Sequence, residues 1–327
     1  YARYSHAYEL ILDKIRFLGV KPADPSLLGF ESRVMWTSSF RSPSPGVFAG
    51  WLGTAWLAGI AGAVVAIRRA IRERHLRPGV FLALWMAAAF VVLFALIWRM
   101  DIFAAFFVVV LAGAAVPREV RTDKGLAILL LLLGMVWLDN WKARRFTLVS
   151  VSPPPAQYQP VLGFIRENTA SNDVILALFP FSPVICAYTE RPVVVHSKFE
   201  NRRVREKVEE FYTALCGNEA DFYVFCRKYG VGYFVYEPSM VYDTTTESVR
   251  YMADRLSIDE SSAVVQMAFA PANLRHFQLV FQAPLYRVYR VLPEGQKPGP
   301  GIFPVPPAFD GRRCDPKALG IRPAVGH

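Results

Sequence analysis

The arginine at position 99 is the residue of this 327-residue chain whose type and surroundings point most directly to chemistry. It stands in a four-residue stretch, Trp98-Arg99-Met100-Asp101, between two long apolar runs. A guanidinium is always charged, and its planar fork of donors fits phosphate oxygens. If the apolar runs cross a membrane, Arg99 lies at the headgroup level and could hold the phosphate of a lipid carrier. The alternatives are that it reaches lipid headgroups or pairs with Asp101.

Common catalytic and metal-binding signatures are absent from the sequence. It contains no glycine-rich phosphate loop, no zinc-protease motif and no serine-hydrolase motif. The five histidines are scattered, and no pair has metal-ligand spacing. Cys216 and Cys226 could form a disulfide in an oxidising compartment, although buried free thiols are the favoured alternative. We therefore expect no catalytic residue, metal site or cofactor site within this chain.

Most long apolar runs lie in residues 47–141, where four uncharged stretches follow one another. A helix that crosses a bilayer core of roughly 30 Å needs about 20 apolar residues. The two shorter stretches need their flanking residues to reach the headgroups. In the first stretch, Ala55, Gly59 and Ala63 recur every four residues, which lets another helix approach closely. We predict membrane-spanning helices at residues 47–67, 80–97, 102–116 and 125–138.

Charged residues in the connecting segments predict the orientation. The net charge of +10 could indicate nucleic-acid binding, but the basic residues do not alternate with aromatic ones as in a nucleic-acid groove. Five of them fill one connecting loop, as is typical of cytoplasmic loops: Arg68, Arg69, Arg72, Arg74 and Arg77. Residues 98–101, the segment before Pro45 and everything after the fourth run then lie outside the cytoplasm. The basic cluster Lys142, Arg144 and Arg145 opposes this orientation, but long exported domains follow charge rules weakly.

The second half of the chain has the pattern of a water-soluble domain. Residues 142–160 form a Pro-rich linker, residues 161–292 alternate between helix and strand periods, and the Pro- and Gly-rich tail 293–327 is predicted to be disordered. We predict helices at 160–168, 201–216, 218–230 (capped by Asn218) and 246–256, and strands at 174–178, 193–195, 231–236, 277–282 and 286–291. The predicted fold is an α-helical transmembrane bundle of about four helices followed by an extracytoplasmic α/β domain.

Two parts of the sequence resemble oligosaccharyltransferase catalytic subunits. The stretch IWRMDIFAAFFVVVLAG (97–113) resembles the arginine-led helix near the end of their membrane domain. Residues 166–169, 173–178, 191–195 and 228–238 are similar to their exported domain, in the order of a helix ending in ENT, a strand, an RPVVV strand and KYGVGYFVYEP. The resemblance runs from about residue 45 to 292. It implies that Arg99 approaches the phosphates of a lipid-linked sugar donor.

One departure from that family concerns the acceptor. Oligosaccharyltransferases carry Trp-Trp-Asp-Tyr-Gly after the first exported strand, where this chain has Phe179-Pro180-Phe181-Ser182-Pro183. No carboxylate remains there to accept a hydrogen bond from a threonine hydroxyl. The resemblance therefore supports the wider GT-C superfamily of glycosyltransferases and argues against asparagine-linked glycosylation. Phe179 and Phe181 could contact donor or acceptor, but packing in the core is the favoured alternative.

The acidic residues that carry the base or the metal in that family lie in early external loops, which would precede Tyr1. The chain has no initiator methionine, so we expect it to be the carboxy-terminal part of a longer protein, with any divalent metal bound upstream. Residues 1–46 correspond to a late external loop that contains an amphipathic helix, with Tyr8, Ile11, Ile15 and Leu18 on one side. Glu31 and Arg33, in the same loop, could contact donor or acceptor or form a solvated pair; Asp101 is a further candidate contact.

The sequence thus predicts the carboxy-terminal portion of a multi-pass cell-membrane glycosyltransferase. Its partners would be membrane lipid, a polyprenyl-phosphate sugar donor and an unidentified acceptor, with transfer on the extracytoplasmic side and Arg99 orienting the donor phosphate. The alternative is a non-catalytic, membrane-anchored exported domain that binds a partner or a cell-wall component. Four helices are more than anchoring needs, which favours the enzyme.

Overall fold

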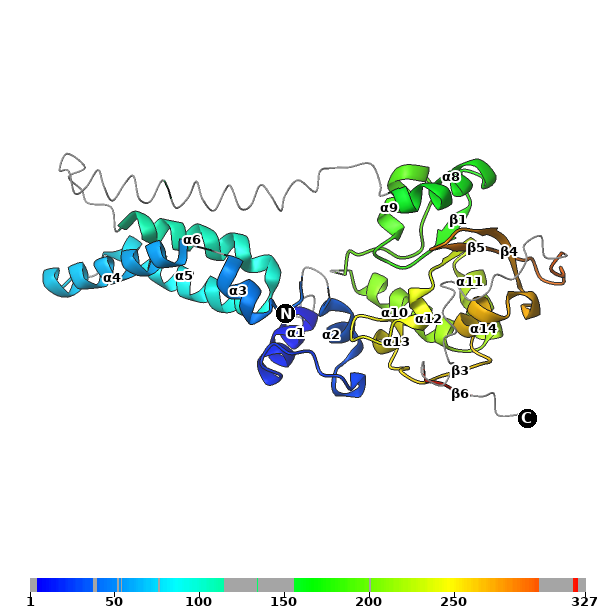
Figure 1. Ribbon diagram of the computed structural model, residues 1–327, viewed down its shortest axis with the longest axis horizontal. Helices are drawn as coiled ribbons and strands as arrows, with labels where there is room; N and C mark the ends of the chain where they lie inside the picture. Colours follow the sequence, from blue (N-terminus) through cyan, green and yellow to red (C-terminus); the bar gives the residue numbers. More distant parts are fainter. Residues whose placement is uncertain are drawn as a thin grey trace. The chain divides into compact units, whose positions relative to one another are not determined.

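The chain forms two compact units in a computed structural model (Figure 1). The structure describes residues 5–37, 40–51, 53, 55–75, 77–114, 134, 156–199, 201–299 and 320–322. One unit consists of Ile11–Lys21 and Met35–Ser152 and contains the apolar helices. The other consists of Tyr1–Leu10, Pro22–Val34 and Pro153–His327 and contains the sheet.

The helical unit is built around a hairpin of apolar helices. After α3 (Pro45–Trp51) come α4 (Ala55–Glu73), α5 (Pro78–Leu96), the short 3-10 helix η3 (Trp98–Met100) and α6 (Asp101–Ala114). The single helix predicted at 47–67 is wrong, because the chain turns at Gly53, whose φ of 50° favours glycine. α4 also continues through Arg68, Arg69 and Arg72, so the predicted loop is partly helical.

Small residues bring α4 and α6 together, as the four-residue spacing predicts. A β-carbon on Gly62 would collide with the Leu111 carbonyl oxygen, and one on Gly59 would lie 2.5 Å from Val108 Cγ1. Val108 and Leu111 are buried in this contact. The backbone of α4 at Gly59 therefore contacts a side chain of α6, and at Gly62 it contacts the backbone of α6.

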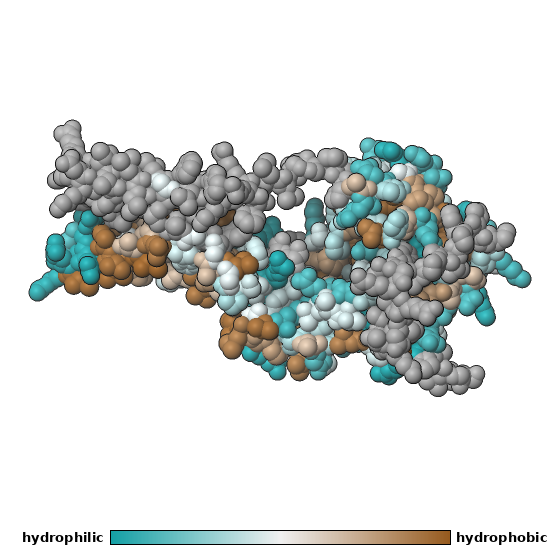
Figure 2. All heavy atoms as spheres, viewed as in Figure 1, coloured by the Kyte–Doolittle hydropathy of each residue, from teal (hydrophilic) through white to brown (hydrophobic). Residues whose placement is uncertain are grey.

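Among the described residues, α5 is the one helix long and apolar enough to cross a membrane by length and composition. Its surface is largely exposed, and the face of this unit seen in Figure 2 is apolar over much of α4 and α5, apart from the hydrophilic end of α4 at the left. α6 is shorter, with 14 residues, and the predicted helix 125–138 lies outside the described residues except for Gly134. A bundle of about four spanning helices thus stays a prediction.

A mixed four-stranded sheet forms the centre of the other unit. The strand order is β1-β2-β5-β4, with β1 (Val174–Leu176), β2 (Val231–Tyr236), β4 (Phe277–Gln282) and β5 (Arg287–Val291). β1 and β2 are parallel, and the remaining neighbours are antiparallel. The β4–β5 hairpin and β2 confirm the predicted strands. The strand predicted at 193–195 contributes a single bridge, from Val193 to Ile175.

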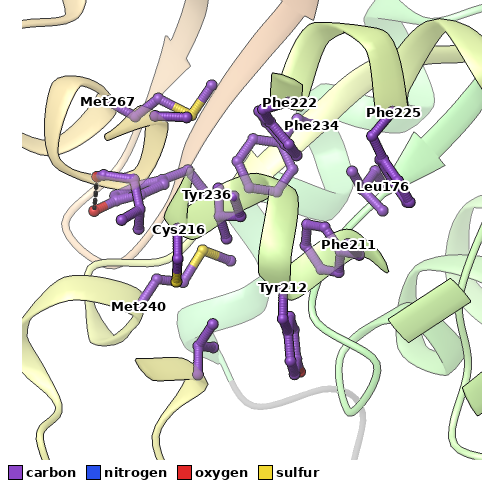
Figure 3. Packing of buried hydrophobic residues seen from close by; sticks show 14 of the residues in the cluster. Leu176, Phe211, Tyr212, Cys216, Phe222, Phe225, Phe234, Tyr236, Met240 and Met267 are labelled. Atoms are coloured by element: carbon purple, nitrogen blue, oxygen red, sulfur yellow. Dashed lines mark hydrogen bonds between the residues drawn. The ribbon is translucent and has the colours of Figure 1, made fainter. Parts of the chain in front are cut away.

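Helices cover both faces of this sheet, as an α/β prediction requires. One face packs on α10 (Arg202–Cys216), α11 (Glu219–Lys228) and α14 (Ala263–Phe269), and the other on α8 (Gln159–Asn168) and α9 (Ser182–Thr189) (Figure 1). Successive strand residues point to opposite faces, so Phe234 joins the first core and Val235 the second. Figure 3 shows Phe234 among Phe211, Phe222 and Phe225 in the larger core.

Several local predictions for this unit are confirmed, one helix is shorter than predicted, and the disordered tail is contradicted at residues 320–322, while its residues 300–319 and 323–327 lie outside the described residues. α8, α10 and α11 match their predicted ranges, and Asn218 caps α11 by accepting a hydrogen bond from the Asp221 amide. The predicted helix 246–256 is only α13 (Val249–Met252), which follows α12 (Ser239–Tyr242). In the tail predicted to be disordered, β6 (Ile321–Arg322) pairs with β3 (Ile258–Asp259), and Ile321 is buried.

The first 46 residues contain the predicted helix and a second one. α1 (Ser5–Arg16) is followed by the 3-10 helix η1 (Pro25–Leu27) and by α2 (Phe30–Met35). Two further 3-10 helices, η4 (Ala156–Tyr158) and η5 (Pro271–Asn273), lie in the second half of the chain. Phe30 and Val34 pack against the larger core of the sheet unit. α2 is therefore part of that domain's fold.

Candidate functional site

The tight turn between α5 and α6 places Arg99 at the end of the helical hairpin. α5 ends at Leu96 because Ile97 adopts an extended conformation (φ −137°, ψ 111°) and is buried. A single 3-10 turn then reverses the chain before α6 begins at Asp101. Arg99 is exposed in this turn, as its position between two apolar runs predicts.

An aromatic ring, and not a carboxylate, supports the Arg99 guanidinium. Its Cζ lies 5.9 Å from the centroid of the Phe40 ring, within the range of a cation–π interaction. The Asp101 carboxylate accepts a hydrogen bond from the Ile102 amide at 2.7 Å. The ion pair between Arg99 and Asp101 considered from the sequence is thus wrong. Among the described residues, no salt bridge compensates the charge of Arg99.

A second arginine, which the sequence did not single out, stands beside the same turn. The Trp98 amide donates a hydrogen bond to the Arg41 carbonyl oxygen at 2.9 Å. The Arg41 guanidinium in turn lies 4.9 Å from the centroid of the Trp98 ring. Arg41 is exposed, as Arg99 is. Residues 40–41 thus contact residues 98–99. Arg99 in the turn and Arg41 beside it are two exposed cations that suit an anionic ligand.

A buried lysine fixes the end of α5 just before this turn. The Lys14 ammonium donates hydrogen bonds to the Leu96 carbonyl oxygen at 2.8 Å and to Ser42 Oγ at 3.1 Å. It also lies 4.3 Å from the centroid of the Trp36 ring. A cation is favourable at the carboxy-terminal end of a helix, where carbonyl groups have no intrahelical partner. Lys14 therefore helps to hold the helix end from which Arg99 projects.

The charge of Lys14 should make stability depend on pH. Burial and, second, the nearby charge of Lys21 lower the pKa of Lys14 from 10.5 to about 7. Between these two values the unfolded chain binds the extra proton, so the free energy of unfolding should rise with pH, by at most about 1.4 kcal/mol per unit. Thermal unfolding of the full-length protein between about pH 7 and 10 measures this slope. Lys14→Met should remove this contribution; an unchanged slope in that variant would contradict the expectation.

Glu31 and Arg33 lie in the sheet unit, where each pairs with a different residue. Glu31 Oε1 accepts a hydrogen bond from Arg205 Nε at 2.6 Å, and Arg33 Nη1 lies 3.2 Å from Asp254 Oδ2. Arg33 and Arg205 are buried. The solvated pair considered from the sequence is therefore wrong, because both residues attach α2 to the domain. Contact with a donor or an acceptor stays a prediction for both.

Loss of the Glu31 carboxylate should destabilise this attachment. Glu31→Gln leaves the buried Arg205 guanidinium without its counter-charge, and we expect a cost of about 1–3 kcal/mol because Glu31 is itself partly exposed. Glu206 provides a matched control. It lies in α10, the helix that also carries Arg205, and forms an exposed ion pair with Arg202 at 2.7 Å. Glu206→Gln should change stability by less than about 1 kcal/mol. Chemical denaturation of both variants makes the comparison; equal effects would contradict it.

Phe179 and Phe181 are both buried, in different cores. The Phe179 ring makes an edge contact with Phe199, with centroids 4.7 Å apart. The Phe181 ring stacks on Tyr286 with centroids 5.0 Å apart and also contacts Tyr158. Core packing, the favoured alternative, is thus confirmed for both rings. A role in contacting donor or acceptor is not tested by this geometry.

The thiols and other metal-ligating groups form no site among the described residues. Cys216 and Cys226 are free and buried, and burial raises the pKa of the Cys216 thiol to about 12 and that of Cys226 further. The disulfide considered for this pair is absent from the structure, and the favoured alternative of buried thiols is confirmed. No group of three His, Cys, Asp or Glu side chains is placed to bind a metal within the described ranges.

Comparisons with known proteins place the chain by family and by fold. Residues 67–291 match the family model described as "Dpy19: Q-cell neuroblast polarisation". No curated protein matches the chain. Archaeoglobus fulgidus oligosaccharyltransferase in the apo form aligns over 76% of this chain at 14% identity, with a TM-score of 0.55. The same enzyme tethered to an acceptor peptide containing an NVT sequon aligns over 85% at 13% identity, with a TM-score of 0.57.

These structural matches show a shared fold. The chain covers 39% of the first structure and 43% of the second, so it spans less than half the length of these proteins. Together with the family match, they show the distant GT-C relationship that residues 97–113 and the second half of the chain indicated.

Proposed function

This chain belongs to the Dpy19 family, and from that membership we propose that it is part of a membrane glycosyltransferase of the GT-C type. The donor is a sugar linked to a polyprenyl phosphate. Transfer takes place on the extracytoplasmic side of the membrane. The acceptor is a molecule other than an asparagine sequon, since Phe179–Pro183 offers no carboxylate to read a threonine hydroxyl.

The observation that carries this proposal is the environment of Arg99. Its guanidinium is exposed at the end of an apolar hairpin and rests on the Phe40 ring. In sugar transfer from a polyprenyl phosphate, the carbon–oxygen bond to the phosphate breaks, and negative charge grows on the departing phosphate. A fixed guanidinium with two parallel donors stabilises that charge more in the transition state than in the ground state. Arg99 therefore orients the donor and assists departure of the phosphate.

The membrane arrangement in this proposal follows the sequence. Residues 47–141 cross the bilayer, with α3 and α4 in place of a single first helix and further crossings at 80–97, 102–116 and 125–138; α5 supports the second crossing. The arginine-rich end of α4 lies in the cytoplasm, and the Arg99 turn lies on the opposite side. After the linker 142–160, the domain at 161–292 is extracytoplasmic. The catalytic carboxylate, and any divalent metal it binds, we assign to parts of the protein outside this chain.

A donor-consumption assay tests the function. Full-length protein in liposomes is incubated with a panel of polyprenyl-phosphate monosaccharides carrying a radiolabelled sugar, together with membrane and secreted protein acceptors. We expect one donor to be consumed, with release of polyprenyl phosphate and appearance of labelled product. A folded protein that consumes no donor, while its exported domain retains a partner or a cell-wall component, would replace the proposal by the non-catalytic alternative.

A further inference from the structure

The segment at the end of α1 presents apolar side chains to the outside of the helical unit. Leu12 and Ile15 on the helix are exposed, and in the turn that follows Leu18 is 88% and Val20 70% exposed. Figure 2 shows a brown patch over α1. Single exposed apolar residues are common on proteins, but a contiguous group marks a contact surface.

The backbone of this turn projects Leu18 outward. Leu18 has a φ of 52° and Gly19 a φ of 75°, and the Gly19 amide donates a hydrogen bond to the Lys14 carbonyl oxygen at 2.7 Å. A left-handed conformation is unfavourable for a large side chain such as that of Leu18. The fold thus maintains an unfavourable backbone conformation at the residue with the most exposed apolar side chain of this segment.

Contacts with the end of α5 hold this turn beside Ala95 and Leu96. The Lys14 ammonium binds the Leu96 carbonyl oxygen, and a β-carbon on Gly19 would lie 3.9 Å from the Ala95 carbonyl oxygen. α5 has 19 residues, a length of about 28 Å, which matches a bilayer core of roughly 30 Å. If α5 spans the bilayer, Leu96 lies where hydrocarbon meets headgroups. The turn at residues 17–20 then lies at that boundary as well.

Basic side chains flank the apolar group. Arg16 is exposed at the end of α1, where its guanidinium lies 5.1 Å from the centroid of the Phe17 ring, and Lys21 follows the turn. Lipid phosphates attract such cations, while the apolar side chains between them fit the adjoining acyl chains. Apolar residues with a basic rim are the pattern of a surface that lies in a membrane interface.

We propose that residues 12–21 form an interfacial anchor, which inserts Leu12, Ile15, Leu18 and Val20 into the bilayer beside the end of α5. The anchor rests on the spanning role of α5 in the proposed function and goes beyond it, because it gives the segment before Pro45 a lipid-binding role. By its contacts through Lys14, it also ties the Arg99 turn to the level of the lipid headgroups.

Spin labels at three depths test the anchor. In the full-length protein, Cys186, which is exposed, and Cys314 are both replaced by serine. This protein is reconstituted in phosphatidylcholine–phosphatidylglycerol vesicles. A nitroxide is attached in turn to Leu18→Cys, to Ala88→Cys near the middle of α5 and to Ala220→Cys on the exposed side of α11. Collision rates with oxygen and with a water-soluble nickel chelate are then compared, because oxygen concentrates in lipid and the chelate in water.

We expect the oxygen-to-nickel ratio at position 18 to fall between a high value at 88 and a low value at 220. A ratio at 18 equal to that at 220 would overturn the anchor, and so would low collision rates with both reagents, which indicate that another protein segment covers Leu18. Water exposure at 88 as well would instead overturn the spanning role of α5 and the membrane arrangement of the proposed function. Labels on Ile15→Cys and Val20→Cys repeat the measurement at neighbouring positions.

Discussion

Arg99→Gln in the full-length protein is expected to lower the kcat of sugar transfer by about 10²–10³-fold, the loss typical when one charge-stabilising donor is removed from a transition state. Glutamine keeps a polar side chain of similar reach but carries no charge, so the departing phosphate loses its fixed cation. Arg99→Lys should recover only part of the rate, since an ammonium keeps the charge and lacks the planar fork that binds two oxygens. Rates of polyprenyl phosphate release measure both variants.

Two controls separate this effect from a loss of structure. Arg99 is exposed and makes one ring contact, so thermal unfolding of Arg99→Gln should stay close to that of the unaltered protein. Arg72→Gln, which removes an exposed cation from α4, should leave the transfer rate unchanged. If Arg99→Gln transferred sugar at the original rate while folded, Arg99 would have no part in the mechanism.

The position of Arg99 was predictable, and the residues that support it were not. Arg99 stands out in the sequence because it is the one basic residue between two long uncharged runs, where Asp101 is the one other charge. Lys14, by contrast, donates a hydrogen bond to the carbonyl oxygen of Leu96, which is 82 residues away in the sequence, and no local sequence pattern predicts that contact. Its one signal was the spacing of four residues between Leu10 and Lys14, which puts both on one face of α1; both are buried. Buried cations of this kind are visible only once the chain is folded.

Local signals explain why most of the sheet domain followed its prediction. Asn218 and Gly230 mark the two ends of α11, and continuous apolar residues mark β2. Such signals act within a few residues, where sequence reading is strongest.

The failed prediction at 246–256 has a tertiary cause. Arg250 is buried and donates hydrogen bonds to the carbonyl oxygens of Val241 and Leu256, which bends the chain around its guanidinium. Helix α13 therefore ends after four residues, and Asp254 adopts a φ of 58°. A periodic pattern cannot reveal that a charged residue will be placed inside the fold.

Gly62→Ala is expected to destabilise the helical unit by about 3 kcal/mol or more, the upper range for inserting a methyl group into a packed contact. The new β-carbon would collide with the Leu111 carbonyl oxygen, because it would come far closer than the 3.0 Å below which real β-carbons essentially never approach another atom. Because that oxygen belongs to the backbone of α6, no side-chain rotation can relieve the clash, and the two helices must separate. In a bilayer, lipid tails replace lost apolar contacts without restoring the close packing that holds such helices together.

A graded series in the same pair of helices makes this prediction sharp. Gly59→Ala should cost less, because its β-carbon meets the Val108 side chain at 2.5 Å, and a side chain can shift. Gly113→Ala, in α6 with nothing within 4 Å of the new carbon, should be neutral or stabilise by up to about 1 kcal/mol through helix propensity. Thermal unfolding and the yield of monodisperse protein in detergent should therefore rank Gly113→Ala above Gly59→Ala and Gly62→Ala last. Equal stability at positions 62 and 113 would mean that α4 and α6 do not pack through Gly62 in the membrane.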